Sequence, residues 1–262
     1  MPRPVEGTQG NSRAAIATRQ AAGTLAWRGL ILMLFARTAF AVAAQGMVAI
    51  VYAMHGSATP WRDAEAWLPV YGTLIDAGCL CLLWWLTRRE GIALIDLIGF
   101  DRGRLWRDAL LGLALIPPSL IFIFGGIAIS SFAIHGGVGL PQFGEPLPWL
   151  PALYALLIWP LIWGFTEQMT YNGYLLPRLQ VLSGSTVFAV AVVALVWALQ
   201  HAFMPLTFEP DYMVHRFASS VPNSLFMVLV YLRLRRLLPL AIAHWLMDGA
   251  SVFVGSILPL LA

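Results

Sequence analysis

The segment from Trp149 to Gly173 reads WLPALYALLIWPLIWGFTEQMTYNG, an apolar run that contains a single charged side chain, Glu167. A helix needs about 20 apolar residues to cross a hydrocarbon core about 30 Å thick, so this run is long enough to span a membrane. A charged group inside such a span costs a few kcal/mol unless it has a partner or a function. The segment therefore predicts a transmembrane helix that carries a candidate functional residue.

The composition of the whole chain agrees with a membrane protein. Its 262 residues are 59% hydrophobic and 11% charged, and its mean hydropathy is +0.75. Soluble domains average about 45–50% apolar and about 25% charged residues. So few charges cannot cover a globule of this size with polar surface, which excludes a soluble enzyme, a disordered chain and a nucleic-acid-binding protein. We expect membrane lipids as partners and no nucleic acid.

Seven apolar runs predict an all-α, polytopic membrane helix bundle. The expected spans are residues 25–54, 68–87, 109–134, 149–173, 185–205, 218–232 and 238–261. We expect a single membrane domain over residues 25–262. Residues 1–24 are polar and lack the apolar core of a secretory signal, so they are interpreted as a mobile cytoplasmic tail.

Arginine placement predicts the orientation of these spans, since the chain contains no lysine. With the N-terminus in the cytoplasm, twelve arginines fall in inner segments, whereas only Arg62 and Arg216 fall in outer segments. Inner loops of membrane proteins carry such an excess of positive charge. The sequence therefore predicts a cytoplasmic N-terminus and an outer C-terminus.

Ionisable side chains inside the predicted spans are few: Arg37, Asp76, Glu167, His201, His244 and Asp248. Arg37 and Asp76 lie on neighbouring spans, each roughly 17 Å from the cytoplasmic end at about 1.5 Å per residue. Their equal depth predicts a structural ion pair, with a role in transport or substrate entry as the alternative. The other four residues have no obvious basic partner in the sequence.

Two imidazoles and two carboxylates on three helices can perform hydrolysis in two ways. They are the ligand types of a hydrolytic zinc that keeps one position for water. They also suit a metal-free site, in which Glu167 activates a water and a histidine stabilises the oxyanion. His244 and Asp248 share one helix face because they are four residues apart. Unrelated helix-packing hydrogen bonds are the third interpretation.

The order and spacing of these residues resemble the CPBP family of intramembrane proteases, which includes CAAX prenyl endopeptidases and Abi-type bacterial relatives linked to bacteriocin processing and immunity. Its motifs are Glu-Glu-x-x-x-Arg followed by Gly, an aromatic-x-x-x-His, and His-x-x-x-Asp or His-x-x-x-Asn. The matching positions, over about residues 149–252, are Glu167 with Gly173, Trp197 with His201, and His244 with Asp248.

Two positions depart from the first motif. Gln168 stands at the second glutamate and Asn172 at the arginine. At a spacing of four residues, an amide hydrogen bond can replace the intrahelical ion pair. Because both charges are replaced together, no unpaired charge is left buried, and we expect the pair to keep a supporting structural role. The second carboxylate is nevertheless lost, together with any catalytic or metal-binding function it has.

The resemblance implies an intramembrane endopeptidase of a bacterial cytoplasmic membrane that cleaves a membrane-associated or prenylated peptide or protein substrate in or near the bilayer. Glu167 would activate the water, His201 would stabilise the oxyanion, and His244 and Asp248 would orient the water. If a metal is present, zinc is the expected ion and these four residues are its expected ligands. Two alternatives stay open: a catalytically inactive relative that acts as a membrane binding or chaperone protein, and a small transporter or proton relay.

The predicted depths of the site residues disagree. Counted from the inner ends of their spans, Glu167 and His244 lie about 9 Å deep, whereas His201 lies about 24 Å deep. One site requires equal depths. We therefore expect either that the fifth span begins as a helix in the cytoplasm or that the site lies in a deep aqueous cavity.

Overall fold

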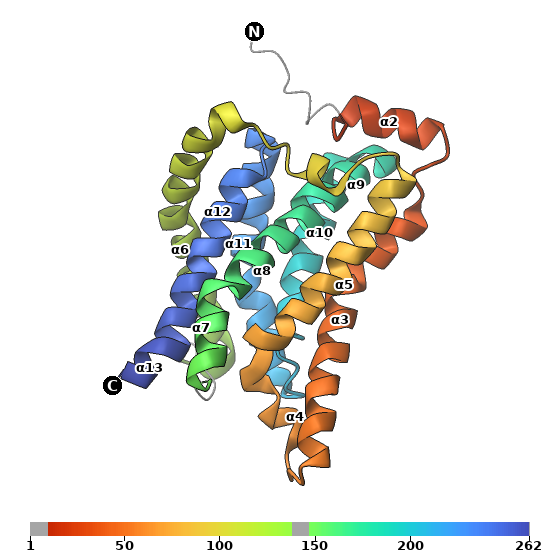
Figure 1. The fold of residues 1–262 in the computed structure, drawn as a ribbon. Coiled ribbons are helices and arrows are strands. Elements are labelled where there is room, and N and C mark those ends of the chain that lie inside the picture. The colour runs from red at the N-terminus through yellow and green to blue at the C-terminus, as the bar shows by residue number, and fades with distance from the viewer. Residues whose placement is uncertain (1–9, 138–146, 262) are drawn as a thin grey trace.

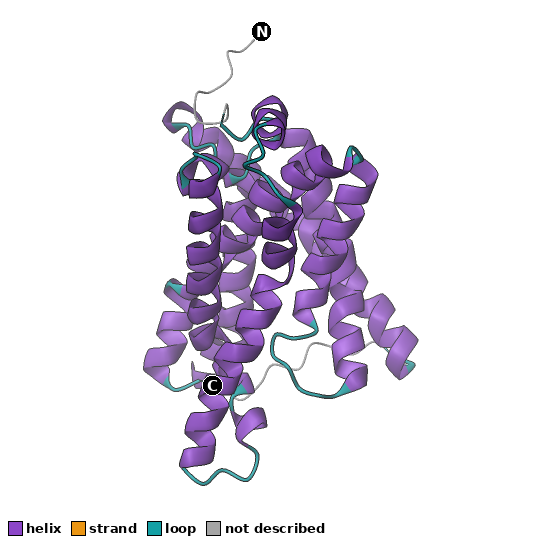
Figure 2. Ribbon diagram, turned by 90° about the vertical axis from the view of Figure 1, so that its right-hand side faces the viewer, coloured by secondary structure: helices purple, strands orange, loops and turns teal. Residues whose placement is uncertain are grey.

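The computed structural model describes residues 10–137 and 147–261, and within these ranges the chain is helical and contains no strand. Figures 1 and 2 show the long helices packed side by side in one bundle. The long segments are α3 (Trp27–Met54), α5 (Leu68–Arg89), α6 (Leu105–His135), α10 (Thr186–His201) and α11 (Pro210–Leu234). Two further segments each consist of several consecutive helices. The first contains α7 (Trp149–Leu157), α8 (Trp159–Gln168), η4 (Met169–Leu175) and α9 (Leu176–Ser183). The second contains α12 (Leu238–Val252), η5 (Phe253–Ile257) and α13 (Leu258–Leu261). Short helices lie between the long segments: α4 (Pro60–Asp63), η1 (Glu65–Trp67), η2 (Leu94–Leu97) and η3 (Arg102–Arg104).

The number of membrane crossings agrees with the prediction. Six helical segments of the described chain are long and apolar enough to cross a membrane, and α10 is a shorter apolar helix. At about 1.5 Å per residue, α10 extends about 24 Å. The helix α2 (Arg13–Ala21) and the C-terminal α13 lie at opposite ends of the bundle in Figure 1, as an odd number of crossings requires. The predicted all-α bundle of about seven spans is confirmed.

The polar N-terminal segment differs from the mobile tail that was predicted. Residues Arg13–Ala21 form α2, and Ser12 caps its first turn. Ile16 is completely buried, and Nε of Arg19 lies 3.1 Å from Oε2 of Glu90 on the loop after α5. One apolar anchor and one ion pair thus dock a helix whose other side chains are alanine or polar, a combination that composition alone does not reveal. Residues 1–9 lie outside the described residues.

The fourth span is longer than predicted, and this removes the disagreement in depth between Glu167 and His201. The helical segment continues beyond Gly173 to Ser183. Glu167 is therefore 16 residues from the inner end of its span, and His201 is 15 residues from the start of α10 at Thr186. At about 1.5 Å per residue both lie roughly 23 Å deep. The helix thus extends beyond the predicted inner end at Gly173. His244 is six residues after the start of α12 at Leu238 and still lies about 9 Å from its inner end. A fifth span that begins as a helix in the cytoplasm, and a deep aqueous cavity, therefore both stay predictions.

Arg178 explains why hydropathy ended this span too early. Its side chain is completely buried. Its Nε and Nη2 each donate a hydrogen bond of 2.7 Å to the carboxylate of Glu90, and its Nη1 donates one of 2.9 Å to Oδ1 of Asn11. A bidentate partner of opposite charge satisfies the guanidinium inside the protein. The partners come from distant parts of the chain, so the charge looks unpaired in a local window.

The helix α8 has α5 and α12 as neighbours, and α3 packs against α5 and α10. The close approach of α8 to α12 depends on Gly164, where an added Cβ would lie 3.0 Å from the backbone nitrogen of Trp245. Small residues allow helices in membranes to approach closely. Since Glu167 lies one turn after Gly164 and His244 precedes Trp245, this contact brings the first and third motifs together.

Candidate active site

Glu167 lies near the C-terminal end of α8 and is completely buried. Its Oε2 accepts a hydrogen bond of 2.8 Å from the indole N–H of Trp197, and its Oε1 accepts one of 2.7 Å from the amide of Gln200. Both donors belong to α10. The helix with the second motif therefore fixes the orientation of the Glu167 carboxylate.

Arg37 is the basic partner of Glu167. Its Nη2 lies 3.2 Å from Oε1 of Glu167, and its Nη1 lies 2.7 Å from Oδ1 of Asp76, with all three side chains fully buried. The predicted pair of Arg37 and Asp76 is confirmed. The expectation that Glu167 has no basic partner is wrong, because the misplaced end of the fourth span set Glu167 at the wrong depth.

Gln200 is a site residue that the sequence analysis missed. Its Oε1 accepts hydrogen bonds of 3.0 Å from Nε of Arg37 and from the hydroxyl of Tyr171, while its amide donates to Glu167. Buried polar groups need such partners, and Gln200 has them on both sides of its amide. The signal available in the sequence was an amide side chain beside His201 in an otherwise apolar span.

His244 brings the third motif to Glu167. Its Nε2 lies 3.6 Å from Oε2 of Glu167 and 3.4 Å from Oδ2 of Asp248. The second distance confirms that His244 and Asp248 share a helix face. Both distances exceed the usual range of an N–H···O bond, about 2.7–3.2 Å, so the imidazole lies beside both carboxylates without a tight bond to either. The structure thus brings Glu167, His244 and Asp248 together.

The amide pair of the first motif forms as predicted. Nδ2 of Asn172, in the π-helix η4, donates a hydrogen bond of 2.8 Å to Oε1 of Gln168. The amide nitrogen of Gln168 in turn lies 3.4 Å from Nδ1 of His244. Because an N–H donor faces Nδ1, this arrangement favours the tautomer of His244 with its proton on Nε2, the nitrogen beside the two carboxylates. Gln168 and Asn172 therefore act on the orientation of His244.

His201 is the predicted site residue with the weakest connection to the others. It is the last residue of α10 and is partly buried. It lies four residues after Trp197 and so on the same helix face, one turn further along. Among the described residues its side chain makes no hydrogen bond or ion pair that joins it to Glu167, His244 or Asp248.

The described side chains do not fit a zinc site in this arrangement. Within residues 10–137 and 147–261, no group of three His, Cys, Asp or Glu side chains is placed to hold a metal ion. The oxygens of Glu167 instead face Arg37, Trp197 and Gln200. A guanidinium 3.2 Å from a carboxylate oxygen repels a second cation at that oxygen. The zinc assignment stays a prediction that metal analysis of the purified protein tests.

One comparison with known proteins covers the part of the chain that contains this site. Residues 148–250 match a family model described as type II CAAX prenyl endopeptidase Rce1-like. No curated protein and no solved structure matches the chain. The matched residues contain Glu167, His201, His244 and Asp248, and the six long apolar helical segments support an integral, multi-pass membrane protein. Residues 148–250 thus resemble an Rce1-like type II CAAX prenyl endopeptidase domain, consistent with the CPBP family of intramembrane proteases.

Proposed function

We propose that the protein is an intramembrane endopeptidase in which Glu167 activates the attacking water. The observation that supports this most directly is the meeting of Glu167, His244 and Asp248, with His244 Nε2 at 3.6 Å and 3.4 Å from the two carboxylates. Glu167 lies roughly 23 Å and His244 about 9 Å from the inner ends of their helical segments, so the site lies within the helix bundle. A membrane-associated substrate, such as a prenylated peptide, suits a site between apolar helices.

The Glu167 carboxylate keeps one hydrogen-bond acceptor site for a water molecule. An ionised carboxylate offers about four lone-pair sites. Oε1 faces Gln200 and Arg37, whereas Oε2 accepts only from Trp197 among the described residues. The remaining acceptor site is therefore on Oε2, the oxygen closest to His244. A water that donates to Oε2 would lie beside the imidazole.

The proposed reaction uses this position. Glu167 would accept a proton from the water as the water oxygen attacks the scissile carbonyl carbon. The C–N bond would then break, and the proton would pass from Glu167 to the leaving amine nitrogen. His244 would donate its Nε2–H to the water, and Asp248 would help to orient that water. His201 would donate a hydrogen bond to the oxyanion, the role that its motif implies.

Cleavage of membrane-tethered and farnesylated peptides by the purified protein, followed by mass spectrometry, tests the proposal. Glu167→Gln should lower turnover by about 100-fold or more, as loss of a general base does. Thr170→Val is a suitable control, because the buried hydroxyl of Thr170 has no hydrogen-bond partner in the described structure and should not affect turnover. His244→Asn provides a second active-site variant if Glu167→Gln fails to fold. Wild-type turnover in Glu167→Gln would refute the mechanism.

A catalytically inactive relative that binds membrane proteins is the second candidate function. It is favoured by the three donors around Glu167, which suit a structural carboxylate, and by the amide at Gln168 in place of a second carboxylate. In that case Glu167→Gln would still complement a deletion phenotype, whereas the endopeptidase requires that complementation is lost.

A further inference from the structure

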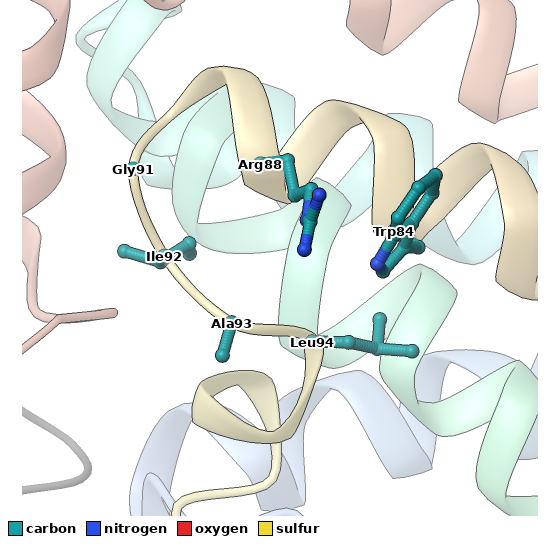
Figure 3. A pocket seen from close by; sticks show the side chains of 6 residues that line it. All are labelled: Trp84, Arg88, Gly91, Ile92, Ala93 and Leu94. Carbon is teal, nitrogen blue, oxygen red and sulfur yellow. The ribbon is translucent and has the colours of Figure 1, made fainter.

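A hollow of about 400 Å³ lies at the inner end of α5, away from Glu167. It is lined by Trp84, Arg88 and the turn of residues 91–94. Figure 3 shows the side chains of Trp84 and Arg88 extending from the helix, with Leu94 on the opposite side. Gly91 has a φ of +73°, and a Cβ there would meet nothing within 4 Å. The chain therefore turns away from the end of α5 and leaves the hollow open.

The position of this hollow corresponds to the surface of the inner leaflet. The arginine distribution places this end of α5 on the cytoplasmic side. Trp84 and Trp85 are 49% and 39% exposed, as is usual for aromatic side chains in the interfacial region of a membrane. Arg88 follows Trp84 by one turn, so it lies about 6 Å further from the membrane centre. An arginine at this level is placed to meet the phosphates of the lipid headgroups.

The guanidinium of Arg88 is available for a ligand. Its Cζ lies 4.7 Å from the ring centroid of Trp84, a cation–π contact that leaves the N–H donors free. Among the described residues, Arg88 has no carboxylate partner. The nearby acids are engaged, since Glu90 pairs with two other arginines and Asp96 accepts a hydrogen bond of 2.9 Å from the N–H of Ala93.

We propose that this hollow binds the phosphate of an anionic phospholipid. Arg88 would donate two parallel N–H bonds to phosphate oxygens, and the glycerol and first methylene groups would contact Trp84 and Leu94. The chain beyond the hollow continues an apolar surface toward the bilayer, with Ile95 58% and Trp106 74% exposed. The site lies outside the proposed active site and does not depend on its chemistry.

Titration of the purified protein with short-chain lipids tests this site. The probes are dihexanoyl phosphatidylglycerol, dihexanoyl phosphatidylcholine and inorganic phosphate. Arg89→Gln is the matched control for Arg88→Gln, because Arg89 stacks on Trp85 at 3.9 Å at the same helix end but does not line the hollow. Arg88→Gln should weaken phosphatidylglycerol binding about fivefold, and Arg89→Gln by less than about twofold.

Three results would overturn the proposal. Equal weakening by the two substitutions would indicate diffuse attraction of anionic lipid to a basic surface. Equal binding of the two lipids by the wild-type protein would remove the preference for an anionic headgroup. Binding of inorganic phosphate as tight as that of phosphatidylglycerol would assign the hollow to a soluble phosphate. Unchanged melting temperatures of both variants would show that the comparison reports on binding.

Discussion

Replacing Arg37 with glutamine tests whether one buried cation joins four helices. Arg37 on α3 contacts Asp76 on α5, Glu167 on α8 and Gln200 on α10 at 2.7, 3.2 and 3.0 Å. The glutamine is shorter and uncharged, so it leaves two fully buried carboxylates without the guanidinium. A buried carboxylate that loses its partner is strongly unfavourable, because neither water nor another charge replaces it.

The expected loss of stability is large for a single substitution. Removing one partner of a buried ion pair costs about 3–5 kcal/mol. The guanidinium also lies 4.3 Å from the ring centroid of Trp163, a contact whose loss adds about 0.5–2 kcal/mol. With about 2–4 °C per kcal/mol for a chain of this size, Arg37→Gln should lower the melting temperature by about 10 °C or more.

Thermal unfolding in detergent, followed by intrinsic fluorescence, measures this effect. Arg62→Gln is the control, because Arg62 is exposed in the outer connection and its loss should shift the melting temperature by less than about 2 °C. The Arg37→Gln/Asp76→Asn double variant removes one orphaned charge, so it should be at least about 1 kcal/mol more stable than the sum of its single effects predicts. Additive effects of the two substitutions, or an Arg37→Gln variant with the melting temperature of the wild type, would refute this account of the Arg37 contacts.

Two further substitutions test the packing and the amide pair of the site. Gly164→Ala should lower turnover about tenfold, because its Cβ would lie 3.0 Å from the Trp245 nitrogen and displace α12 by a few tenths of an ångström. Gly125→Ala, where a Cβ meets nothing within 4 Å, should keep wild-type turnover, and equal effects of the two would contradict this reasoning. Gln168→Glu should lower the melting temperature by several degrees because it buries a carboxylate. The Gln168→Glu/Asn172→Arg double variant should recover most of that loss by forming an ion pair. A double variant no more stable than Gln168→Glu alone would show that an ion pair cannot replace the amide pair.

The fold was predictable from hydropathy because backbone polar groups in lipid must be satisfied within helices, and long apolar runs reveal such helices. Hydropathy was misleading where residues distant in the sequence neutralise a charge or dock a helix. Arg178 ended the predicted fourth span, although Glu90 neutralises its charge inside the protein. The helix α2 was missed because its docking depends on one buried side chain, Ile16, and on an ion pair with Glu90.

Contacts within one helix were predicted better than contacts between helices. The pairs Gln168–Asn172 and His244–Asp248 follow from the fixed geometry of residues four apart, and both occur. The contact of Arg37 with Glu167 depends on how α3 is rotated toward α8, and a single sequence carries no information on that rotation. The order of the motifs predicted the meeting of Glu167, His244 and Asp248, whereas the neighbours that satisfy their charges required the structure.

The partners of Glu167 decide how the two motif departures bear on activity. Arg37, Trp197 and Gln200 hold the Glu167 carboxylate, and none of them belongs to the altered amide pair. The replacement of both charges in the first motif therefore leaves the environment of the proposed base intact. The amide pair reaches the site only through the 3.4 Å contact of Gln168 with His244. If the departures lower activity, they should act through the orientation and tautomer of this imidazole rather than through Glu167.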